Sequence, residues 1–184
     1  QKQSASERMG IISYLGHDPE LFNDSIEANV LMGDQADAAY FLQMVCLDEE
    51  VNEMDEGLNT LVGNGGIRLS GGQAQRLALA RTLCHKKPVL ILDDPFSALD
   101  KNTEKQIFAN LRQMTKDTVV LLISHRLYLF PETDQVLWME NGRTISGNHQ
   151  ELLERVPEYK VLFEAQTENR NRSDAGAHTD EKVH

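Results

Sequence analysis

The stretch Val89-Leu-Ile-Leu-Asp-Asp94 decides the fold, because a wholly aliphatic run ends in two carboxylates directly before Pro95. A continuous aliphatic run of this length is typical of a strand buried on both faces of a parallel sheet. The two acids could simply cap a helix or a turn, but a buried carboxylate must be paired or bind a metal. Because Mg²⁺ is held through one or two carboxylates plus substrate phosphates, we expect a metal at this pair. The adjacent acid could then orient or deprotonate a water.

A second motif, Ser70-Gly-Gly-Gln73, opens a predicted helix over residues 71–84. Ser70 as N-cap and Gln73 as its capping-box partner give the ordinary explanation. The two glycines do not fit that explanation, since each costs about 1 kcal/mol against alanine in a helix and a cap does not need them. They suit a helix start that an anion approaches closely. Taken alone, the motif leaves capping and phosphate binding equally open.

Strands and helices alternate along the rest of the chain. We predict strands at 9–15, 89–93 and 118–124, followed by a hairpin from 135 whose turn is Asn141-Gly142. Helices are predicted at 25–32 with Asp24 as N-cap, at 35–47, 71–84 and 103–114, and from 150. This order predicts an α/β fold with a parallel sheet covered on both faces.

Two polar stretches are given no role in the predicted site. Residues 48–56 hold six acids in nine positions, a pattern that usually marks a solvated surface. From about Gln166 to the C-terminus the composition is polar without a period, which predicts a disordered tail.

Three predicted strands end in polar side chains, namely His17, Asp93-Asp94 and His125. In open parallel sheets, ligands bind beyond the carboxyl ends of the strands. A single histidine such as His125 is more often a hydrogen-bonded core residue, but its place at a strand end favours function. We therefore expect all three sets of side chains to gather at one edge.

Composition limits the classes of protein that need to be considered. The net charge of −11 over 184 residues argues against a nucleic-acid surface. It does not argue against nucleotide binding, since backbone N–H groups and a metal can neutralise phosphates locally. The longest apolar runs are far shorter than the roughly 20 residues of a spanning helix, and no signal-peptide pattern is present. Cys46 and Cys84 suggest two buried free thiols of a cytosolic protein.

These motifs together resemble those of ATP-binding cassette (ABC) proteins, over residues 9 to about 165. The stretch Thr60-Leu-Val-Gly-Asn-Gly-Gly66 resembles the Thr-x-x-Gly-Glu-x-Gly sequence that precedes the signature in exporter-type cassettes. The other matches are Tyr14–Phe22 to the Q-loop region, Leu69–Arg76 to the signature motif, Val89–Asp94 to the Walker B strand, Ser97–Asp100 to the D-loop and Ile123–His125 to the switch histidine.

The resemblance implies a P-loop NTPase-like (RecA-like) parallel sheet with an inserted α-helical signature subdomain, incomplete at the N-terminus. Its expected division is 1–22 for a core remnant with the Q-loop region and 23–84 for the helical subdomain. Residues 85–165 would then form the remaining core, and 166–184 the tail.

The resemblance also implies a partner and a set of ligands. Two ABC cassettes dimerise head to tail, and each ATP lies between the P-loop of one cassette and the signature helix of the other. By this carry-over Ser70, Gly71, Gly72 and Gln73 would hold the γ-phosphate of the partner's nucleotide. The remaining expected roles are Asp93 near Mg²⁺, Asp94 at the general-base position, His125 on the γ-phosphate of the same-side nucleotide, His17 at the Q-loop position and Asp100 reporting across the interface.

Three substitutions depart from the family pattern. His17 replaces the Q-loop glutamine, Asn64 replaces the glutamate of the pre-signature stretch, and Asp94 replaces the catalytic glutamate. The shorter side chain withdraws the carboxylate by roughly 1.5 Å, and a 1 Å misplacement can cost about a hundredfold in rate. Changes at 17 and 94 weaken this chain's own catalytic site while its signature is intact, which resembles the degenerate half of a heterodimeric exporter.

The sequence has no Gly-x-x-x-x-Gly-Lys-Ser/Thr loop, because no lysine is followed by serine or threonine. We expect a cassette truncated before its P-loop and adenine-stacking aromatic, inactive alone, with an uncovered sheet face and an open edge. The expected parent is an ATP-driven exporter at the cytoplasmic face of the membrane, joined to a transmembrane domain. Two alternatives stay open. One is a regulatory or structural cassette in which bound nucleotide only holds two cassettes together. The other is a soluble ABC ATPase, although the acidic surface and residues 60–66 argue against it.

Overall fold

The computed structural model describes residues 10–63 and 66–180, with side chains of the last helix described as far as Glu168. The Asn64 substitution lies outside these residues. The chain divides into two compact units, one ending at Ile123 and the other beginning at Ser124. Each unit is described by itself.

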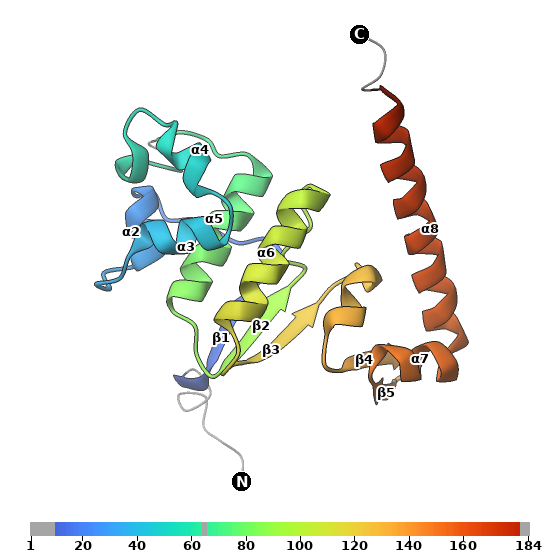
Figure 1. Cartoon of the computed structure of the whole chain (residues 1–184). Helices are drawn as coiled ribbons and strands as arrows, with labels where there is room; N and C mark the ends of the chain where they lie inside the picture. The colour runs from blue at the N-terminus through green and yellow to red at the C-terminus, as the bar shows by residue number, and fades with distance from the viewer. Residues whose placement is uncertain (1–9, 64–65, 181–184) are drawn as a thin grey trace. The chain divides into compact units, whose positions relative to one another are not determined.

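A three-stranded parallel sheet organises the first unit (Figure 1). Its strands, in spatial order, are β1 (Ile12–Leu15), β2 (Val89–Asp93) and β3 (Val119–Ile123). Leu15 pairs with Leu92, and Asp93 pairs with Ile123. The bounds of β2 are those that the sequence predicts, because Pro88 and the two aspartates delimit the aliphatic run.

The two faces of this sheet differ in exposure. Leu15, Leu90 and Leu92 are almost fully buried, whereas Tyr14 and Val119 are 60% and 67% exposed. Strand side chains alternate between faces, so one face carries the core and the opposite face is open. The prediction of a sheet covered on both faces is therefore wrong for the described residues, and the expected uncovered face is present.

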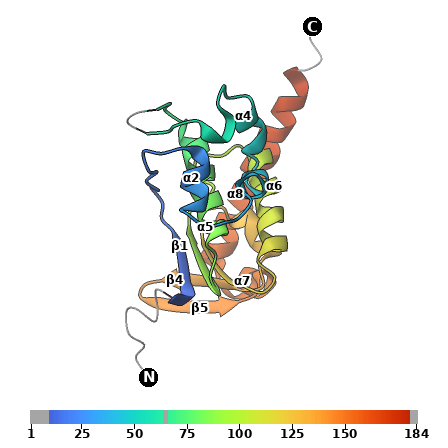
Figure 2. The ribbon, with the colours of Figure 1, turned by 90° about the vertical axis from the view of Figure 1, so that its left-hand side faces the viewer.

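Helices α2 (Ile26–Leu31), α3 (Ala38–Met44) and α4 (Asp48–Asn52) precede the long helix α5 (Gly71–Cys84). Figure 2 shows α2 and α4 beyond one end of strand β1, whereas α5 reaches back alongside the strand, where the Ser13 hydroxyl donates to the His85 carbonyl. Helices α2 and α3 pack directly on α5, whose Leu77–Ala80 segment is fully buried. A 3₁₀ turn, η1 (Gly57–Asn59), follows α4. Helix α6 (Lys101–Met114) connects β2 to β3.

Side-chain caps decide where these helices begin. Ser25, and not the predicted Asp24, caps α2 by accepting a hydrogen bond from the Ala28 N–H at 3.0 Å. Asp24 instead accepts from the Ser25 N–H. Asp37 caps α3, so that helix begins three residues later than predicted. Neighbouring capping residues compete for one helix start, and the sequence alone does not tell which one succeeds.

The second unit is built on a hairpin and two helices. Strands β4 (Val136–Glu140) and β5 (Arg143–Gly147) join through Asn141 and Gly142, both at positive φ as a two-residue turn requires. The 3₁₀ helix η2 (Leu127–Glu132), α7 (His149–Arg155) and α8 (Pro157–Asp180) complete the unit. Its core consists of Leu127, Val136, Leu152, Val156 and Tyr159.

Helix α8 differs from the predicted disordered tail, because the backbone is helical from Pro157 to Asp180. The polar composition from Gln166 onward provides no continuous apolar face, but residues 158–180 contain no proline that would end the helix. Residues 181–184 lie outside the description. No helix within the described residues is long and apolar enough to cross a membrane.

The two cysteines are free thiols, as predicted, although both are half-buried and not fully enclosed. Burial raises the pKa of both thiols. At neutral pH they are therefore poor nucleophiles.

Candidate functional site

The start of α5 is a complete capping box. Ser70 Oγ accepts from the Gln73 N–H at 3.2 Å, and Gln73 Oε1 accepts from the Ser70 N–H at 2.9 Å. The capping interpretation of this motif is thereby confirmed. The N–H groups of Gly71 and Gly72 lie in the first turn, where a helix offers its donors no internal acceptor. Ser70 and Gly71 are exposed, so the geometry leaves room for an anion as well.

The two glycines serve different purposes. A Cβ added at Gly72 would lie 2.9 Å from the carbonyl oxygen of Ala98, closer than side chains tolerate. At Gly71 the nearest atom would be Ala98 Cβ, at 3.9 Å. Gly72 is therefore needed for the close approach of the chain's own segment Ser97–Asp100. Gly71 has no such internal reason, and its backbone faces open space.

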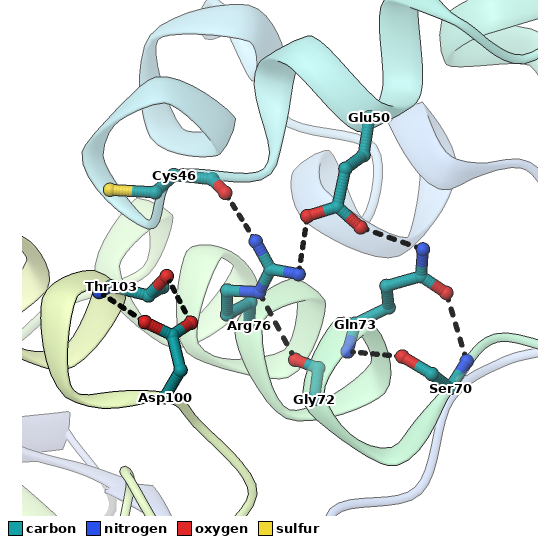
Figure 3. A network of polar contacts seen from close by, with 8 residues as sticks. All are labelled: Cys46, Glu50, Ser70, Gly72, Gln73, Arg76, Asp100 and Thr103. Carbon is teal, nitrogen blue, oxygen red and sulfur yellow. Dashed lines mark hydrogen bonds and ion pairs between the residues drawn. The ribbon is translucent and has the colours of Figure 1, made fainter. Parts of the chain in front are cut away.

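Below the cap, a polar network ties α5 to α4 (Figure 3). Glu50 accepts from Gln73 Nε2 at 2.7 Å and from Arg76 Nη2 at 2.6 Å. Arg76 also donates to the carbonyl oxygens of Cys46 and Gly72. Arg76 is only 8% exposed, so most of its charge is balanced by these oxygens. Both ends of the Gln73 amide are thus bonded to protein groups.

Glu50 is a residue that sequence reasoning missed. It stands in the acidic run 48–56, which was interpreted as a solvated surface. Two of its neighbours, Leu47 and Val51, are buried and fix α4 against the core. The cations and amides that Glu50 meets are more than twenty residues away, so no local pattern distinguishes it from the other acids.

Asp100 caps α6 with a charged side chain. Its Oδ1 accepts from the N–H groups of Asn102 and Thr103 at 2.9 and 3.1 Å. The Thr103 hydroxyl donates to Oδ2 at 2.6 Å. This hydroxyl contact, followed by the backbone bonds, holds the pKa of Asp100 below its usual value.

Strand β2 ends in the two aspartates, and they leave the strand differently. The Tyr14 hydroxyl donates to Asp93 Oδ2 at 3.4 Å. The Asp94 N–H still donates to the Ile123 carbonyl at 2.8 Å, but its φ of +47° turns the chain out of the sheet. Aspartate tolerates this left-handed conformation better than most residues. The Asp94 carbonyl then accepts from Ser97, which begins the segment that packs on Gly72.

His17 and Asp94 are brought together, as predicted for the ends of neighbouring strands. His17 Nδ1 lies 3.8 Å from Asp94 Oδ2, with the histidine side chain 55% exposed and the aspartate 16% exposed. The loop after His17 is also fixed to α5. Arg81 donates to the Glu20 carbonyl at 2.6 Å and lies 5.1 Å from the centre of the Phe22 ring.

His125 belongs to the second unit and is exposed there. Its backbone carbonyl accepts from Gln166 Nε2 at 2.7 Å. That His125 joins the aspartates at a common edge stays a prediction. Asp93, Asp94 and His17 are all carried by the first unit, together with the start of α5.

The chemistry of these groups fits a metal-bound nucleotide better than a metal alone. Among the side chains that the structure describes, no group of three or more His, Cys, Asp or Glu is arranged to hold a metal ion. One or two carboxylates suffice for Mg²⁺ when phosphate oxygens complete its coordination. The open amides at Gly71 suit a phosphate, and the carboxylates at the end of β2 suit a metal ion that phosphate oxygens also hold.

Comparison with known proteins identifies the family. The sequence profile described as "ABC transporter" matches residues 1–97, which is more than half of the chain. The chain belongs to the ABC transporter family. Its relatives, described next, confirm two predictions from the motifs of this ABC chain, namely the α/β fold and the exporter type.

Two curated relatives are ATP-dependent lipid A-core flippases. The protein of Burkholderia pseudomallei is 43% identical over 161 residues, covering 84% of this chain and 27% of the relative. That of Ralstonia nicotianae is 37% identical over 163 residues, covering 84% and 28%. A solved structure of a bacterial Atm1-family ABC exporter with ATP bound matches with a TM-score of 0.81 at 30% identity, covering 88% of this chain and 30% of that one. The chain thus spans about a quarter of the length of these curated relatives.

Proposed function

We propose that this chain forms part of the nucleotide-binding domain of an ATP-driven ABC exporter, in which ATP binding and hydrolysis drive substrate across a membrane. The observation that carries the proposal is the joint presence, in one unit, of the open α5 start and the carboxylate pair of β2. The Ser97–Asp100 segment links the two, since it follows Asp94 and packs against Gly72. The ATP-dependent relatives support the same conclusion.

The α5 start is proposed to hold the γ-phosphate of a nucleotide bound to a second cassette, in a head-to-tail dimer. Ser70 can still donate its hydroxyl proton while it accepts from Gln73, and Gly71 and Gly72 offer backbone N–H groups. The helix dipole adds a favourable potential for an anion at this end. The side chain of Gln73 acts indirectly, because Ser70 and Glu50 already occupy it.

At the end of β2, Asp93 would hold Mg²⁺ and Asp94 would stand where the attacking water is activated. Bound ATP with Mg²⁺ supplies the phosphoryl group that is transferred to water. In this chain His17 Nδ1 lies 3.8 Å from Asp94 Oδ2, so the imidazole stands beside the proposed water-activating carboxylate. His125, in the second unit, is proposed to contact the γ-phosphate, and Asp100 to report across the dimer interface.

We further propose that this cassette is the degenerate half of a heterodimer, attached to a transmembrane domain and acting at the cytoplasmic face of the membrane. The motivation is that both His17 and Asp94 depart from the family's residues, whereas Ser70–Gln73 do not. Turnover would then occur at the partner's site, completed by this chain's α5. The 184-residue chain by itself should hydrolyse essentially no ATP. The competing possibility is a regulatory cassette that nucleotide only holds in place.

The experiment places one added negative charge at each of two helix starts in the complete transporter. Gly71→Asp meets no close neighbour, so it should fold, and its charge should oppose the γ-phosphate. We expect ATP turnover to fall about a hundredfold, the usual effect of losing transition-state charge stabilisation. Asn102→Asp adds the same charge at the start of α6 and should leave turnover within about twofold. Equal turnover in both variants would refute the proposed phosphate site.

A second pair of variants tests degeneracy. Asp94→Glu combined with His17→Gln restores the family residues at this chain's own site. A large gain in turnover, measured with the partner's site inactivated, supports the degenerate half. No gain supports the regulatory cassette.

A further inference from the structure

Helix α8 carries three side chains on one face that reach the rest of the second unit. Tyr159, Phe163 and Gln166 are spaced four and three residues apart, so they lie one above another on the helix. Tyr159 is fully buried in the core that also contains Leu127, and Phe163 packs against that core. Gln166 continues this face by one turn, at the position where the sequence predicts a disordered tail.

Gln166 uses both ends of its amide on the backbone that follows β3. Its Oε1 accepts from the Leu127 N–H at 2.9 Å. Its Nε2 donates to the His125 carbonyl at 2.7 Å. The two bonds hold the main chain on either side of Arg126, 41 and 39 residues before the glutamine in sequence.

This backbone needs such a partner. Leu127 is the first residue of η2, and the first N–H groups of a helix have no acceptor within it. Ser124 Oγ accepts from Arg126, and the Arg126 carbonyl accepts from Leu129. Those local bonds leave Leu127, which is only 6% exposed, to the glutamine. An unsatisfied buried N–H is costly.

We propose that Gln166 is a positioning residue for His125, through which helix α8 sets where the imidazole lies. The proposal rests on the function proposed above, in which His125 contacts the γ-phosphate. The His125 backbone carbonyl is held, while the imidazole is exposed. Fixing the backbone of an exposed side chain restricts where its tip can reach, and displacement on the 1 Å scale is enough to lower a rate strongly.

The first unit contains a second example of a helix amide that holds an irregular segment with both of its ends. Asn29 Oδ1 accepts from the Phe22 N–H at 2.9 Å, and its Nδ2 donates to the Phe22 carbonyl at 3.0 Å. Asn29 is fully buried and sits on α2, whereas Gln166 is partly accessible. A helix amide therefore fixes a loop in each unit.

The test uses the complete transporter and two measurements. Amide hydrogen exchange of the segment 124–129 reports the backbone without reference to activity. ATP turnover at this chain's own site is measured with the family residues restored by Asp94→Glu and His17→Gln and with the partner's site inactivated. In that background the variants are Gln166→Ala, Gln166→Glu, His125→Ala and the double variant His125→Ala/Gln166→Ala. Gln166→Glu keeps an oxygen for Leu127 but turns a second oxygen toward the His125 carbonyl. Gln150→Ala is the control, since Gln150 bonds only to Glu154 on its own helix surface among the contacts described.

If Gln166 positions His125, exchange of the Leu127 amide rises about tenfold in Gln166→Ala. It rises less in Gln166→Glu, and Gln150→Ala leaves it unchanged. Turnover falls in both Gln166 variants, and the double variant is no slower than His125→Ala alone. Unchanged exchange in Gln166→Ala, or a double variant in which the two losses multiply, would overturn the proposal. If His125→Ala leaves turnover intact, the proposed role of His125 is wrong. The exchange data then still test whether Gln166 holds the Leu127 N–H.

Discussion

Helices α5 and α6 are both 14 residues long and both begin with a side-chain cap, yet their starts are chemically opposite. Asp100 brings a carboxylate to α6 and neutralises the helix dipole from within the chain. Ser70 brings a neutral hydroxyl to α5, followed by two glycines without side chains. A cap satisfies donors in either case, but only a neutral, bare cap leaves the positive end of the dipole for an external anion. The α5 start therefore has the neutral, open form that an anion-binding helix start requires, which agrees with the proposed phosphate contact.

The largest effect should come from removing the anchor beneath the α5 start. Arg76→Ala deletes a nearly buried cation, so Glu50 loses one of its two donors and the Cys46 carbonyl loses its bond from Arg76. Arg76 is nearly buried but the Glu50 side chain is 39% exposed, so the cost lies at the lower end of that for breaking a buried pair, about 3 kcal/mol. We expect that loss in the free energy of unfolding, measured by urea denaturation followed by circular dichroism. Lys105→Ala, on the exposed face of α6, should change it by less than about 0.5 kcal/mol.

The next largest effect should be a difference in stability between alanine variants of the two glycines. Gly72→Ala pushes a methyl group against the Ala98 carbonyl, and overpacking of this kind costs about 1–3 kcal/mol. Gly71→Ala meets no such contact and should be neutral or stabilise by up to about 1 kcal/mol. Denaturation of the two variants side by side measures the difference. Equal destabilisation by both would mean that the Ala98 approach does not explain the glycine at 72.

Removing a helix cap should cost a similar amount of stability at α5 and at α3 but have different functional results. Ser70→Ala and Asp37→Ala each remove a capping acceptor, worth about 1 kcal/mol. Only Ser70→Ala should also weaken the response to nucleotide, because only that hydroxyl is proposed to meet a phosphate. ATP-dependent association of the two cassettes, measured by analytical ultracentrifugation, distinguishes the two variants. An equal loss of association in Asp37→Ala would mean that the loss at Ser70 comes from the helix cap and not from a phosphate contact.

The smallest effect is on pH dependence. Because the Thr103 hydroxyl keeps the pKa of Asp100 low, the carboxylate stays charged in the folded state below its unfolded value of about 3.9. Its contribution to stability is present above that value and is lost as the pH falls through the lowered pKa. The stability gap between wild type and Asp100→Asn should stay constant from pH 7 to about 5 and narrow below about 4. The gap for Ser70→Ala should not change over this range, and a gap for Asp100→Asn that narrows already near pH 6 would contradict the assignment.

Local signals predicted part of this molecule well. The bounds of α5 and β2 match the sequence, because a capping box and a proline-bounded aliphatic run are complete within a few residues. The pairing of His17 with Asp94 followed from parallel strands ending together. The cap of α2 was misplaced by one residue, where Asp24 and Ser25 are both suitable.

Long-range partners could not be predicted. Glu50 resembles the five other acids around it until Gln73 and Arg76 are placed beside it. Gln166 lies in a polar stretch, and the backbone that it bonds is about 40 residues earlier in the chain. In both cases a polar side chain on a helix bonds to a group far away in the sequence. Neither hydrophobic periodicity nor composition indicates which group that is.

In the proposed dimer, an ATP bound to the partner cassette meets the amides that open α5. Amide hydrogen exchange of the complete transporter, with and without ATP and Mg²⁺, tests this contact most directly in a variant that binds ATP but does not hydrolyse it. We expect slower exchange at Gly71 and Gly72 when ATP is bound, with little change at Asn102 and Thr103, whose N–H groups Asp100 already holds. Saturating ATP that leaves exchange at Gly71 and Gly72 unaltered would contradict it.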